Sequence, residues 1–173
     1  MIVDTKALVS VDEYLHTDYS PDCDYVDGEI VERNVGEFEH ANLQLEIGMY
    51  LRSSYRQSGL VVVVEQRVQV APTRFRVPDV CVKAGGGPVE QIFHTPPLVA
   101  IEILSPEDRV TAMQKHVGDY LTFGIRYVWV IDPQERTAIV HTRTGSYQSQ
   151  DLILRTENPE IVLPLPEIFA ALQ

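Results

Sequence analysis

The amino-acid sequence predicts a mixed α/β fold, in which helices pack against a sheet, and three observations support this prediction. Apolar residues recur every three or four positions across residues 40–55, which is the period of a helix with one buried face. Several short runs rich in valine and isoleucine follow, as is typical of strands. A strand, a helix and another strand then follow one another across residues 98–131, an order that favours a right-handed parallel crossover within a mixed sheet.

The segments up to the first long helix are short. Residues 11–15 form an amphipathic segment, and a hairpin is expected around Asp27-Gly28, a dipeptide typical of tight turns. The long helix is expected from about His40 to Tyr55 and should end before Gly59. The residues expected on its packed stripe are Leu43, Ile47, Tyr50, Leu51 and Ser54.

The next elements are predicted to be strands that follow one another. Residues 60–64 and 67–70 have strand composition, a break comes at Pro72, and the apolar run 76–82 follows. Such a succession predicts a meander of antiparallel strands. Residues 83–97 contain three consecutive glycines and are expected to be a plain surface connection, with a mobile flap over the site as the alternative.

The second helix has a marked start in the sequence. Ser105 is expected as its N-cap, with Pro106 at the first helical position and two acidic residues in the first turn. The residues expected on its inward stripe are Val110, Met113, Val117, Tyr120 and Leu121, and Gly124 should end it. Strands are expected at residues 127–131 and 137–143, and the apolar tail 161–169 should dock on the core.

Length and composition favour one domain covering residues 1–173, since a single hydrophobic core commonly serves a chain of this size. A cytoplasmic protein without membrane contact is expected, because no leader-like segment and no stretch of about 18 apolar residues occurs. Cys23 and Cys81 lie far apart and lack companion ligands, so neither zinc nor a disulfide framework is indicated.

The formal net charge of −11 argues against a protein that coats nucleic acid with its whole surface. The net charge does not exclude a local basic cleft, which would form if basic side chains converge. Scattered solvated charges are the alternative. The candidates for such a cleft are Arg52, Arg56, Arg67, Arg74, Arg76, Arg109 and Lys115.

Two acidic residues, Asp79 and Glu102, interrupt apolar runs that otherwise read as buried strands. A carboxylate taken out of water must be paired, hydrogen-bonded or metal-bound, or else it stays neutral through a raised pKa. Two such residues in neighbouring strands suggest one site, and oxygen ligands of this kind suit magnesium. The structural alternative is a buried acid pair satisfied by Arg76 or by backbone N–H groups.

The order and spacing of several motifs resemble the Uma-two family of proposed restriction endonucleases, within the PD-(D/E)XK nuclease superfamily, from about Val11 to Phe169. The motifs are DYVDGEIVE at 24–32, His40, RVPDV at 76–80, IEILSP at 101–106, Tyr120, Gly124 and YVWVIDP at 127–133. The resemblance implies a restriction-endonuclease-like core, built as helix, three-stranded meander, helix and strand. An N-terminal hairpin and C-terminal strands would be additions to it.

The resemblance also implies site residues. Asp79 and Glu102 are the expected ligands of magnesium or manganese, with the carbonyl of Ile103 as a third ligand. The superfamily's usual lysine is replaced by Leu104, and the family places a lysine instead on the following helix, at the position of His116. Taking about 100° per residue, His116 lies closer to the packed stripe than Lys115 does, so His116 is better placed to reach the site.

Further residues have weaker support. His40 matches a histidine of the family and is expected near the metal or the substrate phosphate, with a solvent-facing position as the alternative. Glu29 and Glu65 are candidate accessory acids. Arg76 and Arg109 are candidates for contact with the substrate. Tyr120, Tyr127 and Trp129 resemble a base-stacking platform in composition, but their spacing favours core packing.

The function expected from these features is a metal-dependent endonuclease that cuts DNA, acting as a homodimer because cleavage of both strands needs two sites. The alternative from another class is a noncatalytic DNA-binding or protein-interaction module on a degenerate nuclease fold, since His116 stands where lysine is expected. A nuclease that acts on RNA or branched DNA is a third possibility, because the same carboxylates would serve it.

Overall fold

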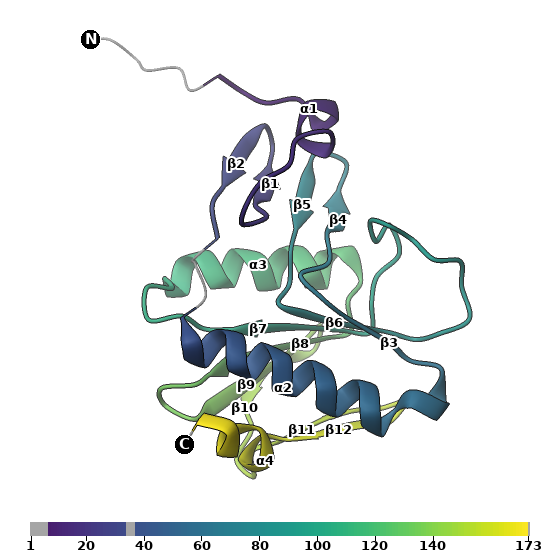
Figure 1. Ribbon diagram of the computed structural model, residues 1–173, viewed down its shortest axis with the longest axis vertical. Helices are drawn as coiled ribbons and strands as arrows, with labels where there is room; N and C mark the ends of the chain where they lie inside the picture. Colours follow the sequence, from purple (N-terminus) through teal and green to yellow (C-terminus); the bar gives the residue numbers. More distant parts are fainter. Residues whose placement is uncertain (1–6, 34–36, 173) are drawn as a thin grey trace.

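The computed structural model describes residues 7–33 and 37–172, and the strands in this part of the chain form three sheets. The largest sheet has the strand order β10-β9-β8-β7-β6-β3 (Figure 1). Its strands are β3 (Val61–Val64), β6 (Val80–Lys83), β7 (Val99–Ile103), β8 (Tyr127–Asp132), β9 (Thr137–Thr142) and β10 (Gly145–Gln148). Only β7 and β8 run parallel, so the predicted crossover is confirmed.

The two long helices, α2 (Phe38–Ser54) and α3 (Val110–Phe123), cover opposite faces of this sheet (Figure 1). Leu43, Ile47 and Leu51 of α2 share one core with Val99, Ile101 and Ile103 of β7. Val117 and Tyr120 of α3 share another with Ala100, Val128 and Val130. Because side chains alternate along a strand, Glu102 points from β7 to the α3 side.

The first long helix agrees with the prediction in place and in most of its packed stripe. It begins two residues before His40, and Ser54, expected to be buried, is exposed. A 3-10 turn, η1 (Arg56–Ser58), extends it to Gly59, which takes a left-handed conformation at φ 68°.

The predicted meander is wrong in one respect, because residues 67–70 do not join the large sheet. They form β4 (Val68–Ala71), which pairs with β5 (Arg74–Arg76). Strand β5 in turn pairs with β1 (Asp24–Val26), which forms the N-terminal hairpin with β2 (Glu29–Val31). The sheet β2-β1-β5-β4 projects from the α3 side in Figure 1. The true meander is β3-β6-β7, and the β4–β5 excursion lies between its first two strands.

The projecting sheet has its own small core. Tyr14 of α1 (Val11–Leu15) packs on Tyr25 and Phe75, and its ring centroid lies 4.9 Å from that of Tyr25. The Tyr14 hydroxyl donates to the carbonyl of Cys23 at 2.8 Å. This aromatic cluster supports the strand that presents Asp24 to the large sheet.

The predicted start of α3 is wrong. The helix begins at Val110 after Arg109, and Ser105 instead opens a turn that Asp108 closes. The Ser105 N–H donates to the Asp108 carboxylate at 2.7 Å, and the Asp108 N–H donates to the Ser105 carbonyl at 2.9 Å. The residues that suit a helix start also suit such a turn. Val110, expected to be buried, is therefore 73% exposed, while Gly124 ends α3 as predicted.

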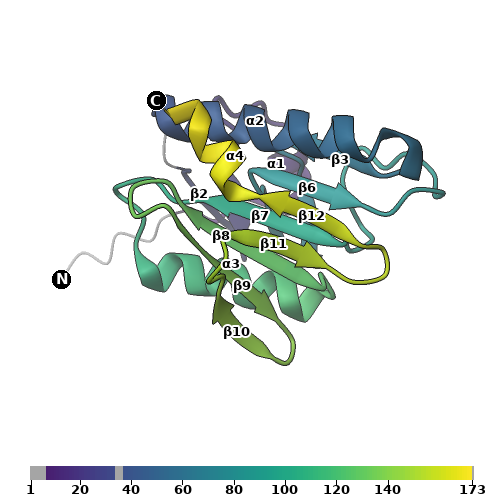
Figure 2. The ribbon, with the colours of Figure 1, turned by 90° about the horizontal axis from the view of Figure 1, so that it is seen from below.

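The C-terminal tail docks as expected. It forms β12 (Ile161–Pro164), α4 (Leu165–Phe169) and η2 (Ala170–Leu172), which lie beside α2 (Figure 2), and β12 pairs with the preceding strand β11 (Ile153–Thr156). Leu165, Ile168 and Phe169 are buried in the core that α2 covers. No helix in the described ranges is long and apolar enough to cross a membrane.

Candidate functional site

A cavity of about 260 Å³ opens where β6 begins and β7 ends. Val80 pairs with Ile101, so the next positions, Asp79 and Glu102, are neighbours at the same end of the two strands. Both carboxylates are nearly excluded from solvent and both line this cavity. The remaining walls come from the segment after β2, the start of α2, the turn before α3 and α3 itself.

Asp79 is held by donors on both of its carboxylate oxygens. Oδ1 accepts from Nη2 of Arg33 at 2.7 Å. Oδ2 accepts from the N–H of Ile103 at 2.7 Å and lies 3.2 Å from Nε2 of His40. Burial opposes the charged form of His40, but the hydrogen bond and charge of Asp79 outweigh it, so the pKa of His40 is raised.

Glu102 faces α3. Its Oε1 accepts a hydrogen bond of 2.5 Å from the Tyr120 hydroxyl and lies 3.5 Å from Nδ1 of His116. Burial raises the pKa of Glu102, an effect that the charge of Asp79 reinforces and that His116 and Tyr120 oppose. Burial also raises the pKa of Tyr120 well above its ordinary value, so the phenol keeps its proton and acts as donor.

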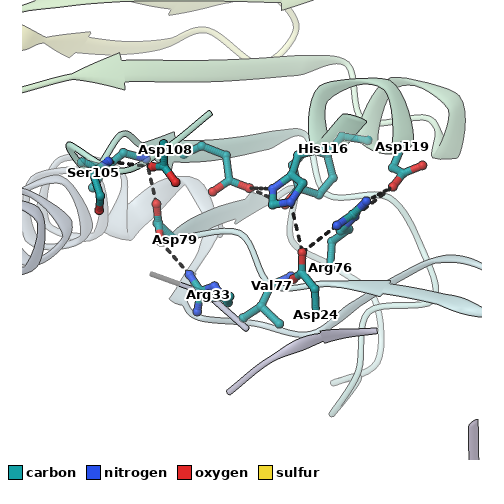
Figure 3. A network of polar contacts seen from close by, with 12 residues as sticks. Asp24, Arg33, Arg76, Val77, Asp79, Ser105, Asp108, His116 and Asp119 are labelled. Carbon is teal, nitrogen blue, oxygen red and sulfur yellow. Dashed lines mark hydrogen bonds and ion pairs between the residues drawn. The ribbon is translucent and has the colours of Figure 1, made fainter. Parts of the chain in front are cut away.

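His116 bridges two carboxylates that come from different sheets (Figure 3). Its Nε2 lies 3.2 Å from Oδ2 of Asp24, which the β1 strand of the projecting sheet supplies. Burial disfavours the charged imidazolium, but Glu102 and Asp24 outweigh this effect and raise the pKa of His116. The charged form is therefore favoured beside the cavity.

Asp24 is in turn fixed by the projecting sheet. It accepts from Nη1 of Arg76 at 2.8 Å and from the N–H of Val77 at 3.0 Å. Arg76 also donates to Asp119 of α3, with Nη2 at 2.6 Å from Oδ2 (Figure 3). The chain of alternating charges thus runs from Glu102 through His116 and Asp24 to Arg76 and Asp119.

The structure brings several of the sequence-predicted residues together. Asp79, Glu102, Ile103, His40, His116 and Arg109 all line the cavity. His40 contacts Asp79 rather than facing solvent, so the solvent-facing alternative is wrong. Arg109 is exposed at the cavity. A backbone N–H was expected as one possible partner of the acid pair, and the Ile103 N–H is such a partner for Asp79.

Other predicted residues lie elsewhere. Lys115 is exposed and lines a different hollow, together with Arg74 and Asp119. Glu29 is exposed on β2, and the exposed Glu65 does not line the cavity but has its Oε1 3.9 Å from Nη1 of Arg33, which does. Arg76 is 4% exposed and pairs with Asp24 and Asp119, not with the two cavity acids.

The seven basic residues considered for a cleft do not converge on one site, and three of them, Arg74, Arg76 and Lys115, line a hollow other than the candidate cavity. Arg52 and Arg56 line a hollow at the end of α2, and Arg67 is paired with Asp22. Of the seven, Arg109 alone lines the candidate cavity. Tyr120 and Trp129 are fully buried, so core packing is confirmed for both rings.

Sequence reasoning missed Arg33, Asp24 and the hydroxyl of Tyr120 as partners of the site. Arg33 lies 46 residues before Asp79 in the chain and follows a short exposed strand, so no periodicity points to it. Asp24 carried a signal, since it opens the hairpin motif DYVDG and is a charged residue at the start of a strand. That signal does not identify His116 as the partner of Asp24.

The donor set is compatible with a hard divalent cation. Two carboxylates and the Ile103 carbonyl are oxygen ligands, and magnesium usually takes few protein carboxylates and keeps several waters. In the described residues the contacts of Glu102 all fall on Oε1. No group of three or more His, Cys, Asp and Glu side chains in residues 7–33 and 37–172 is arranged to hold a metal ion.

Comparison with known proteins gives one family model and solved structures that resemble this chain. A family model described as "Putative restriction endonuclease" matches residues 11–173. The crystal structure of a protein from Anabaena variabilis, described as a putative nuclease, superposes with a TM-score of 0.81 at 24% identity, covering 95% of this chain and 99% of that one. This similarity shows a shared mixed α/β fold.

A second solved structure, the DrdV–DNA complex, matches with a TM-score of 0.41 at 12% identity, over 71% of this chain and 10% of that one. That similarity is too low to support an argument. The search of curated proteins returned no match.

Proposed function

The chain belongs to the Uma-two family, described as putative restriction endonucleases, and from this membership we propose that it is a metal-dependent endonuclease that hydrolyses phosphodiester bonds in DNA. The observation that carries the proposal is the pair of neighbouring buried carboxylates, Asp79 and Glu102, on the wall of one cavity. The succession α2, β3, β6, β7, α3, β8 is compatible with the core that this family's nuclease superfamily uses.

Asp79, Glu102 and the carbonyl of Ile103 would hold magnesium or manganese. When bound, such an ion lowers the pKa of a coordinated water and stabilises negative charge on the attacked phosphodiester. The protein contributes fixed positions for the two carboxylates, because the Ile103 N–H orients Asp79 and the Tyr120 hydroxyl orients Glu102.

His116 is the candidate to supply positive charge at the substrate phosphate. Its raised pKa favours the imidazolium, and Asp24 holds the ring on the side away from Glu102. Arg109, exposed at the same cavity, is the candidate for a contact with the DNA backbone. Arg76 is assigned to holding Asp24, since its guanidinium is already engaged.

Two observations favour a second candidate function, a noncatalytic module that binds DNA or protein. Leu104 replaces the usual lysine, and both oxygens of Asp79 are already paired with protein donors. A nuclease acting on RNA or branched DNA stays a further possibility, because phosphodiester hydrolysis needs the same ligands in each case.

The test is incubation of the purified protein with supercoiled plasmid, single-stranded DNA and RNA in magnesium or manganese. We expect DNA cleavage, lost by about 10²-fold or more in Asp79→Asn and Glu102→Gln, as is usual when groups that stabilise transition-state charge are removed. Glu107→Gln, an exposed residue of the same cavity, is the matched control. A His116→Ala variant should lose far more activity than Lys115→Ala.

The competing functions give different results. Intact substrates under all conditions, with binding of DNA retained, would favour the noncatalytic module. Cleavage of RNA alone would change the substrate class. Equal activity of Asp79→Asn and wild type would refute the assigned site. A homodimer is proposed for double-strand cleavage, and light scattering on the purified protein measures its mass directly.

A further inference from the structure

Arg33 connects a buried carboxylate with an exposed one. Its Nη2 lies 2.7 Å from Oδ1 of Asp79, whose side chain is 3% exposed. Its Nη1 lies 3.9 Å from Oε1 of Glu65, whose side chain is 54% exposed. The two arms of one guanidinium therefore face a buried carboxylate of the cavity and a solvent-exposed carboxylate.

The pairing with Asp79 conflicts with metal binding in two ways. The guanidinium covers Oδ1, an oxygen that a divalent cation would use, and Oδ2 is already engaged by Ile103 and His40. Its positive charge also repels a second cation at close range, and the repulsion is poorly screened because the Arg33 side chain is only 16% exposed. A divalent cation would therefore compete with Arg33 for Asp79.

Glu65 is placed to receive the displaced guanidinium. Its backbone N–H donates to the carbonyl of Asp79 at 3.1 Å, which fixes the two acids relative to each other. Glu65 also takes a positive φ of 50°, an unusual conformation for a residue with a side chain. The carboxylate of Glu65 thus lies beside Arg33, on an exposed residue next to Asp79.

We propose that Arg33 is an exchangeable counter-cation of the metal site, which neutralises Asp79 before metal binds and moves to Glu65 when a divalent cation takes its place. This inference rests on the proposed function, because it describes how the same site is regulated by metal. Arg33 neutralises the buried Asp79 without metal, and in doing so it lowers the metal affinity.

The experiment is calorimetric titration of manganese into the full-length protein without DNA. We expect Arg33→Gln to bind manganese about tenfold more tightly than wild type, since removal of a nearby charge from a poorly screened site changes binding by about that much. Arg33→Lys keeps the charge and should stay close to wild type. Arg155→Gln, which removes an arginine of β11 paired with Asp151, is the charge-matched control.

Substitution of Glu65 should change the manganese affinity in the opposite direction to substitution of Arg33, and only while Arg33 is present. Glu65→Gln should weaken manganese binding about threefold, because the displaced guanidinium loses its acceptor. The same substitution should have no effect when Arg33 is already glutamine, since coupled residues show their interaction in a double-mutant cycle. Circular dichroism and thermal unfolding of each variant establish that it is folded.

Three outcomes would overturn the exchange or the site. If wild type binds manganese and Arg33→Gln binds no more tightly, Arg33 does not compete. If Glu65→Gln weakens binding equally in both backgrounds, Glu65 acts on the metal itself. If neither wild type nor any folded variant binds manganese, the proposed metal-dependent function fails as well. If Arg33→Gln binds manganese and wild type does not, the result supports competition between Arg33 and the metal most strongly.

Discussion

At the scale of single residues, the site depends on how each buried carboxylate is compensated. Asp79 receives a guanidinium, an imidazole and a backbone N–H, whereas Glu102 receives a phenol and an imidazole on one oxygen. Burial raises the pKa of Glu102, and His116 and Tyr120 only partly offset that effect.

The Tyr120 hydroxyl should contribute measurably to stability. Tyr120→Phe removes the donor to Glu102 and leaves a buried acceptor without it, which should cost about 1–3 kcal/mol. The free energy of unfolding from urea denaturation measures this loss. Tyr147→Phe, at a ring that is 56% exposed, serves as the control and should change stability little. Equal stability of Tyr120→Phe and wild type would contradict the assigned hydrogen bond.

The sequence identified the residues that interrupt apolar patterns and two of their partners, His40 and His116, but it missed Arg33 and the Tyr120 hydroxyl. Asp79 and Glu102 stand out because a carboxylate within a buried strand is costly. Helix geometry separated His116 from Lys115, and the structure places only His116 beside Glu102. Arg33 was missed because its pairing with Asp79 spans 46 residues and depends on how the hairpin packs on the large sheet.

At the scale of elements, the projecting sheet matters because it delivers Asp24 to α3. The sequence predicted the β1–β2 hairpin from its Asp-Gly turn, but it gave no sign that β4 and β5 would leave the main sheet. The same alternation of apolar residues would suit β4 and β5 in either sheet, so the sequence could not determine with which strands they pair. The start of α3 was misplaced because Asp108 closes a turn on Ser105 instead of beginning the helix.

Asp24 should be essential for attaching the projecting sheet. Asp24→Asn keeps the shape but removes the charge between Arg76 and His116, and breaking a buried ion pair costs about 3–5 kcal/mol. Urea denaturation should show this loss of stability, and Asp18→Asn at an exposed position should not. A loss below about 0.5 kcal/mol in Asp24→Asn, the usual range for surface substitutions, would mean that the network does not hold the sheets together.

The connection between β6 and β7 should lose an interaction at low pH. Glu90 accepts from Lys83, from Thr95 Oγ1 at 2.7 Å and from the His94 N–H at 3.1 Å, and these bonds, Lys83 first, lower the pKa of Glu90 from 4.5 to about 2. A lowered pKa means that the stabilisation is complete above pH 4.5 and is lost as the pH falls toward 2.

Glu90→Gln should therefore be less stable than wild type at pH 7, by about 0.5–1 kcal/mol for a pair close to the surface. The difference should shrink between pH 4.5 and pH 2.5, because wild type gradually loses the same charge. Urea denaturation of both proteins at a series of pH values measures it. A difference that is constant over this range would show that the Glu90 charge has no stabilising role.

At the scale of the whole molecule, the cavity forms where separate parts of the chain meet. The large sheet supplies Glu102 and the adjacent Asp79, α3 supplies His116, the start of α2 supplies His40, and the segment after β2 supplies Arg33. A cation bound there would contact residues on neighbouring strands and would favour the folded state. Metal binding and folding stability should therefore be linked.

Manganese should raise the thermal unfolding temperature of wild type and leave that of Asp79→Asn/Glu102→Gln unchanged. A ligand that binds only the folded state adds about 2.7 kcal/mol of stability at a free concentration of 100 times its Kd. Addition of EDTA should reverse the shift, and calorimetric scans measure it. An equal shift in the double variant would place the bound ion elsewhere on the surface.

A crystal structure of the protein with manganese, in which anomalous scattering locates the ion, tests the proposed metal site. We expect one strong anomalous peak between the Asp79 and Glu102 carboxylates, with the Ile103 carbonyl as a further ligand and the Arg33 guanidinium turned toward Glu65. A cavity without an anomalous peak at saturating manganese, with Arg33 still on Asp79, would contradict the central claim that these two acids form a divalent-cation site.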